Sequence, residues 1–68
     1  MIAVTVNGEK RQVQREAKVA DLLAELGIGG RKVAVERNRE IIKRENYETT
    51  ELRDGDVFEI IEFVGGGI

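Results

Sequence analysis

Apolar residues alternate with small or polar ones at the start of the chain, which is the pattern of a strand with one buried face. Residues 2–6 read Ile-Ala-Val-Thr-Val, and this period of two fits a half-buried strand. Asn7-Gly8 follows directly, and both residues tolerate the positive φ angles of a tight hairpin turn. The return segment, residues 9–14, keeps only Val13 as a clearly apolar residue. We therefore expect a charged return strand near a sheet edge.

The period changes to that of an amphipathic helix after residue 18. One apolar stripe with spacing i, i+3, i+4 and i+7 is formed by Val19, Leu22, Leu23 and Leu26. Asp21 in the first turn suits the positive end of the helix dipole, and Gly27 can end the helix in a left-handed conformation. Ala17 or Lys18 would occupy the N-cap, so we expect the helix to begin without the usual capping side chain.

Two short apolar segments follow a loop at Gly29-Gly30. Residues 33–35, Val-Ala-Val, predict a third strand, and the polar residues 36–39 predict a turn. Ile41-Ile42 then predicts a short strand that returns along the third.

The rest of the chain contains one irregular segment and one strand. Residues 43–50 have weak periodicity and predict a loop with a helical turn, with Tyr47 and Leu52 as its apolar anchors. Asp54-Gly55-Asp56 is typical of a turn. Residues 57–64 predict the last and most apolar strand.

The order strand, strand, helix, strand, short strand, strand predicts the fold. A single helix covers only one face of a sheet, so we expect an α+β fold with a mixed sheet of four to five strands. The first and last strands are the most apolar and belong at the centre, paired in parallel through the helix crossover. This is a β-grasp, or ubiquitin-like, architecture. We expect it to span residues 1–64, with residues 65–68 as a flexible, glycine-rich C-terminal tail.

Apolar side chains point to both faces of the last predicted strand. Phe58 and Ile60 share one face, whereas Ile61 and Phe63 share the other. We expect the first pair to face the helix and the second pair to lie on the open face. Two large exposed apolar side chains would form a small partner-binding surface there. The alternative is a β-bulge that turns all four side chains inward.

Composition excludes most routes to catalysis by this chain. The 68 residues include no Cys and no His, so a thiolate nucleophile, the usual acid–base near neutral pH and the commonest metal ligands are absent. We expect no bound cofactor or metal and no enzymatic activity of its own. The formal net charge is −2, which argues against nucleic-acid binding.

The sequence also indicates where the protein is found. No apolar run approaches the roughly 20 residues of a membrane span, so we expect no membrane partner. The N-terminus lacks the regions of a signal peptide. We therefore expect a cytoplasmic location.

Two polar segments could be mistaken for binding loops. The carboxylates of Asp54 and Asp56 flank a glycine, and Asp and Gly are standard turn residues. The segment Gly29-Gly30-Arg31-Lys32 lacks the spacing of a phosphate-binding Walker motif. Both are expected to be plain connections.

The last predicted strand leads into Gly65-Gly66-Gly67. One interpretation is a frayed tail or a linker. The other is a tail that enters a narrow active site of another enzyme, where any Cβ would collide with the walls. The reactive group would then be the backbone carboxylate of the last glycine, which requires no Cys or His.

Segments spread over nearly the whole chain resemble the ThiS family of sulfur carriers. They are Asn7-Gly8, Val19–Leu23, Val33–Asn38, Glu40–Arg44, Leu52–Asp56 and Glu59–Gly67. The resemblance implies that a ubiquitin-activating-like enzyme uses ATP to adenylate the carboxylate of Gly67, with Gly65 and Gly66 in its active site. Sulfur from a cysteine desulfurase system then displaces AMP and leaves a thiocarboxylate. Thiazole synthase accepts this sulfur in thiamine biosynthesis.

The chain departs from the family pattern at Lys43, where many members have Pro, and at Ile68, which follows the last glycine. While Ile68 is attached, the carbonyl of Gly67 belongs to an amide and cannot be adenylated. We therefore expect a processing peptidase to remove it. Three alternatives stay open: a carrier for another sulfur pathway, a ubiquitin-like modifier joined to lysines, and a non-covalent β-grasp binding module.

Overall fold

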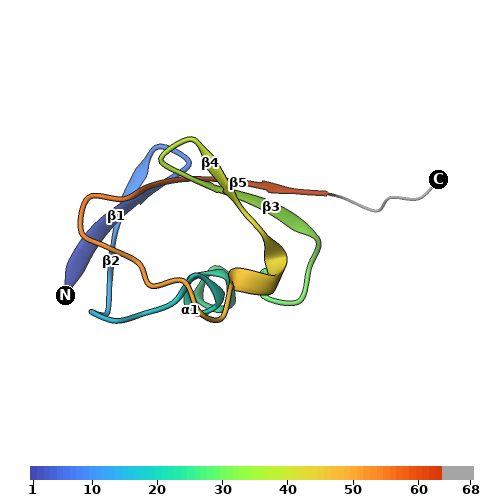
Figure 1. Ribbon diagram of the computed structural model, residues 1–68. Coiled ribbons are helices and arrows are strands. Elements are labelled where there is room, and N and C mark those ends of the chain that lie inside the picture. Colours follow the sequence, from blue (N-terminus) through green and yellow to red (C-terminus); the bar gives the residue numbers. More distant parts are fainter. Residues whose placement is uncertain (64–68) are drawn as a thin grey trace.

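The N-terminal hairpin forms where the alternation predicts it. The computed structural model describes residues 1–63, and in it β1 (Ile2–Val6) pairs antiparallel with β2 (Glu9–Val13) (Figure 1). Asn7 and Gly8 have φ angles of 49° and 86°, the positive values that a two-residue hairpin turn requires. β2 ends one residue earlier than expected and lies at an edge of the sheet, as its charge predicts.

The helix α1 spans Val19–Glu25 and buries Val19, Leu22 and Leu23. Leu26 stands at the C-cap, and Gly27 follows with φ of 80°, the predicted left-handed end. Lys18 is the N-cap, as predicted, and it is not one of the usual capping residues. Its backbone N–H donates instead to the carboxylate of Asp21 at 2.8 Å, which fixes the start of the helix.

The second hairpin differs from the sequence prediction in its turn. β3 (Val33–Arg37) is longer than expected and pairs antiparallel with β4 (Glu40–Ile42). The turn therefore consists of two residues rather than the predicted residues 36–39. Asn38 and Arg39 adopt φ angles of 50° and 73°. Arginine rarely occupies this region, so the sequence offered no signal for so tight a turn.

The segment before the last strand anchors itself on the core as predicted. A short 3₁₀-helix, η1 (Arg44–Asn46), precedes Tyr47, which packs against the core, and Leu52 is buried. β5 (Val57–Glu62) is the last strand of the described chain. Val64, the predicted end of this strand, lies outside the described residues.

The five strands form one mixed sheet in the order β2-β1-β5-β3-β4. β1 and β5 are parallel neighbours near the centre, whereas β3 is antiparallel to both β5 and β4. Figure 1 shows α1 on one side of this sheet, with no described helix over the opposite face. The arrangement is the predicted β-grasp.

The core lies between α1 and the covered face of the sheet. Phe58 is fully buried and is the largest of the fully buried side chains. The buried hydrophobic set comprises Val4, Val6, Val13, Val19, Leu22, Leu23, Val35, Leu52, Phe58 and Ile60. These side chains come from α1, four of the strands and the connection before β5, so all of these elements depend on one small core.

Candidate functional site

The alternation along β5 separates a buried face from an open one. Phe58 and Ile60 are buried against the helix, whereas Ile61 and Phe63 expose 58% and 59% of their surface. The predicted orientation of all four residues is confirmed. The alternative, a bulge that turns all four inward, is wrong because β5 keeps a regular register with β3.

The sheet register adds two apolar side chains to the open face. Val57 pairs with Thr5 and is 45% exposed, and Ile41 pairs with Glu36 and is 70% exposed. Ala34 lies opposite Ile61 on the same face. We define the open face by Ala34, Glu36, Ile41, Val57, Glu59, Ile61 and Phe63. Ile41 was not predicted to lie on this face, because the dipeptide Ile41-Ile42 does not show which isoleucine points outward.

Two carboxylates lie among these apolar side chains. Glu36 and Glu59 are cross-strand neighbours in β3 and β5. Together with Asn38, Arg39 and Val57 they line a shallow groove. Like charges directly opposite one another weaken strand pairing, and neither carboxylate forms a salt bridge among the described residues. The open face therefore combines apolar area with two carboxylates, and the cationic side chain of Arg39 borders the same groove.

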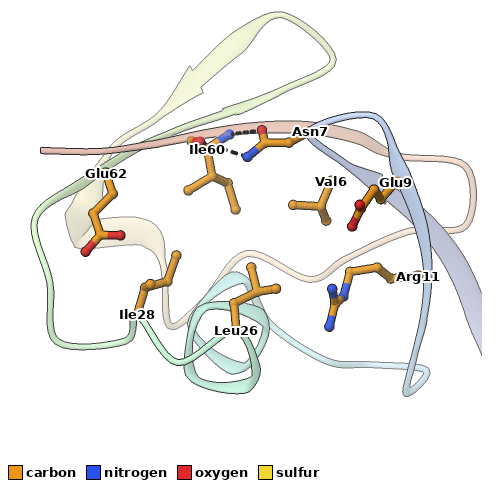
Figure 2. A pocket seen from close by; sticks show the side chains of 8 residues that line it. All are labelled: Val6, Asn7, Glu9, Arg11, Leu26, Ile28, Ile60 and Glu62. Carbon is orange, nitrogen blue, oxygen red and sulfur yellow. Dashed lines mark hydrogen bonds between the residues drawn. The ribbon is translucent and has the colours of Figure 1, made fainter.

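Asn7 holds β5 near the C-terminal end of the strand. Its side-chain amide accepts a hydrogen bond from the N–H of Ile60 at 2.8 Å and donates to the carbonyl of Ile60 at 3.0 Å. Figure 2 shows both bonds. The backbone N–H of Asn7 also donates to the carbonyl of Phe58 at 2.9 Å. The side-chain amide of Asn7 thus forms the two hydrogen bonds with Ile60 that a further residue of β1 would have formed.

The opposite edge of β5 is held by the loop that follows α1. The N–H of Phe63 donates to the carbonyl of Lys32 at 3.0 Å. Arg31 donates to the carboxylate of Glu62 at 2.7 Å, and this hydrogen bond raises the pKa of the Arg31 guanidinium. The backbone of β5 is therefore held on the β3 side as far as Phe63, and on the β1 side as far as Ile60.

The carboxylates of the Asp54-Gly55-Asp56 turn have structural roles. Asp54 accepts from the N–H of Ala3 at 2.9 Å, which holds the start of β1. Asp56 is buried and accepts from the N–H of Arg53 at 2.9 Å and from the Asn38 amide at 3.3 Å. Both carboxylates are engaged by the fold, as the turn interpretation predicts.

The segment Gly29-Gly30-Arg31-Lys32 is also a connection, between α1 and β3. A Cβ on Gly29 would approach the Cα of Ala24 to 3.3 Å. Glycine at this position therefore serves close packing of the loop against the helix.

Metal-binding side chains are not clustered in the described part of the chain. Within residues 1–63, no three His, Cys, Asp or Glu side chains are placed to hold a metal ion. No helix of these residues is long and apolar enough to cross a membrane. The predicted reactive position, Gly67, and its neighbours Gly65 and Gly66 lie outside the described residues.

A β-grasp domain with a bare sheet face beside its C-terminal strand belongs to the ubiquitin-like class of proteins. Within this class, the sequence profile of the ThiS family matches residues 4–67. The chain belongs to the ThiS family.

A solved structure of the same family has the same fold. The crystal structure of the thiamine biosynthesis protein ThiS from Geobacter metallireducens superposes with a TM-score of 0.80 at 36% identity, covering 97% of this chain and 100% of that one. The β-grasp topology predicted from the sequence is therefore confirmed by both the sheet order and this neighbour.

Two relatives differ in how much of their length the chain covers. The sulfur carrier protein ThiS of Bacillus subtilis (strain 168) is 53% identical over 49 residues, which are 72% of this chain and 74% of that protein. A thiazole synthase of Paramagnetospirillum magneticum is 47% identical over 64 residues, which are 94% of this chain. The chain spans only 20% of that synthase.

Proposed function

We propose that this protein is a sulfur carrier of thiamine biosynthesis that bears sulfur as a thiocarboxylate on Gly67. The observation that carries the proposal is the extent of the family match, which runs through the glycine segment and ends at Gly67. The Bacillus subtilis relative is named a sulfur carrier protein. A chain without Cys or His fits this role, because the partners supply the catalytic groups.

Activation solves a simple chemical problem. A free carboxylate is a poor electrophile, so an adenylating enzyme joins it to the α-phosphate of ATP and pyrophosphate leaves. A persulfide sulfur then attacks the carbonyl carbon of the adenylate, and AMP is the leaving group. Cleavage of the resulting S–S bond by a thiol gives the thiocarboxylate. Glycine at positions 65–67 allows close approach of enzyme groups to the backbone.

The open face supplies the area that an activating enzyme would cover. Ile41, Val57, Ile61 and Phe63 are exposed large apolar side chains, and exposed apolar patches are typical of interaction surfaces. Phe63 is four positions before Gly67 in the sequence. An enzyme that binds this face is therefore close to the carboxylate on which it acts.

Thiazole synthase is the proposed acceptor of the sulfur. A segment similar to nearly this whole chain lies within one thiazole synthase polypeptide. A second thiazole synthase, from Magnetococcus marinus, contains a segment that is 36% identical over 64 residues. Covalent linkage of a carrier to the enzyme that consumes its sulfur would raise their effective concentration.

Intact-mass spectrometry tests the proposal directly. The chain ending at Gly67 is incubated with the ThiS-adenylating enzyme of the same organism, ATP, a cysteine desulfurase and cysteine. We expect replacement of one oxygen by one sulfur, dependent on ATP. Isopeptide adducts on lysines would instead indicate a protein modifier. A chain that acquires no adenylate and no sulfur would contradict the proposal.

The open face is tested by the substitution Ile61→Lys. Burial of an isoleucine side chain is worth about 1.5–3 kcal/mol, so we expect the affinity for the adenylating enzyme to fall by about 10- to 100-fold. Because Ile61 is 58% exposed, the thermal midpoint should change little. Calorimetric titration measures the affinity.

The control is Glu25→Lys, which adds more positive charge than Ile61→Lys but on the exposed surface of α1. Its affinity should stay within about twofold of the unsubstituted chain, because α1 lies on the other side of the sheet. Equal losses from both substitutions would mean that added positive charge, and not the open face, determines binding.

A further inference from the structure

The register of β5 shows which edge each backbone group faces. Val57 accepts from Asn38, and Phe63 donates to Lys32, so odd-numbered residues of this segment pair toward β3. The even-numbered residues face the other edge, where β1 lies. Phe58 and Ile60 indeed bond to Asn7 on that edge. Glu62 follows in the same alternation, so its N–H and carbonyl point to the β1 side.

β1 does not reach Glu62. The last parallel pairing between the two strands joins Val6 and Phe58, and the side chain of Asn7 extends it by one step to Ile60. Gly8 then turns the chain away into β2. Among residues 1–63, no backbone or side-chain group bonds to the N–H or carbonyl of Glu62. The fold thus leaves one donor and one acceptor of a central strand available for pairing.

A pocket of about 300 Å³ adjoins this free edge on the helix side of the sheet. Figure 2 shows that its lining is mixed. The apolar side chains are Val6, Leu26, Ile28 and Ile60, and the polar ones include Asn7, Glu9 and Arg11. Glu62 also lines the pocket, and its carboxylate is engaged by Arg31 at 2.7 Å. A strand added to the free edge would direct alternate side chains toward this pocket.

The other long free edge of the sheet is protected against such pairing. The hairpin register directs the N–H groups of Lys10 and Gln12 in β2 away from β1. This edge has the sequence Glu-Lys-Arg-Gln, and charged side chains of this kind discourage strand addition. The edge at Glu62 is bordered instead by the pocket, to which four apolar side chains contribute.

We propose that an extended segment of the adenylating enzyme adds to β5 at Glu62 and places a side chain in the pocket. The inference rests on the proposed function, because that enzyme must hold Gly67, five positions after Glu62. Five residues reach at most about 18 Å when fully extended. The enzyme therefore lies within reach of the free edge whenever it binds Gly67, and β-strand addition satisfies both unpaired groups.

Backbone esters test this pairing without changing a side chain. Chemical ligation gives chains ending at Gly67 in which an ester oxygen replaces the N–H of Glu62 or, as the control, of Gln12. The N–H groups of both positions lie on free edges. The weaker ester carbonyl belongs to the preceding residue, Ile61 or Arg11, and in both chains it faces a strand that is already paired. Circular dichroism verifies the fold of both, and pyrophosphate release measures the KM for the carrier.

The ester at Glu62 is expected to raise this KM by about three- to tenfold, the usual effect of one lost hydrogen bond, and the ester at Gln12 to leave it unchanged. Equal KM values for both ester chains and the all-amide chain would overturn the inference while leaving the proposed function intact. An all-amide chain that is not adenylated would overturn the proposed function and, with it, this inference.

Discussion

A chain that ends at Gly67 is expected to be adenylated, whereas the same chain with Ile68 attached should give no product. The reason is chemical, since Ile68 converts the carboxylate of Gly67 into an amide. The free carboxylate then belongs to Ile68, one residue further along and beside a branched Cβ, so it is misplaced for reaction. Pyrophosphate release and intact mass, measured on both chains with the same adenylating enzyme, provide the comparison.

The control for this experiment is a chain that ends at residue 67 and contains Gly67→Ala. It keeps a terminal carboxylate but adds a Cβ at the reacting position. Small displacements of reacting groups can cost on the order of 100-fold in rate, so we expect a strong reduction but not complete loss. Adenylation of the chain that still contains Ile68 would contradict the assignment of Gly67.

Phe58→Ala is expected to leave the domain largely unfolded. Phe58 is 0% exposed and lies in the core that joins the sheet to α1. Truncation of a buried phenylalanine costs about 3–5 kcal/mol. The core of a domain this small rarely supplies more than about 3–5 kcal/mol of net stability, so the substitution removes most of it. Circular dichroism during heating should show no cooperative transition.

Phe63→Ala is the matched control, because the same atoms are removed from a side chain that is 59% exposed. We expect its free energy of unfolding to stay within about 0.5 kcal/mol of the unsubstituted chain. A cooperative transition of Phe58→Ala near the original midpoint would refute the central role of this residue in the core.

The fold was predictable because its strongest local signals agree with one another. The alternation in β1, the Asn7-Gly8 turn and the apolar stripe of α1 each identify an element without reference to the rest of the chain. The orientation of Ile61 and Phe63 was predictable for the same reason. Side chains alternate strictly along a strand, so the burial of Phe58 determines the exposure of its odd-numbered neighbours.

Structural features that depend on partners far away in the sequence were not predictable. The turn at Asn38-Arg39 requires a positive φ angle at an arginine. The pairing of β3 with β5 outweighs the preference of arginine for negative φ. Ile41 became part of the open face only through its pairing with Glu36. Local patterns do not contain such pairings, because residues far apart in the sequence form them.

The end of β5 shows most clearly what local sequence patterns determine and what long-range pairing determines. The sequence by itself determined that an apolar strand runs into Gly65-Gly66-Gly67 and that this chain has no Cys or His for chemistry of its own. Only the tertiary structure decided that Asn7 binds Ile60 across 53 positions of sequence. That contact leaves Glu62 without a backbone partner among the described residues, because β1 has turned away one step earlier. Composition and periodicity are local properties, whereas a free strand edge exists only once the whole sheet is assembled.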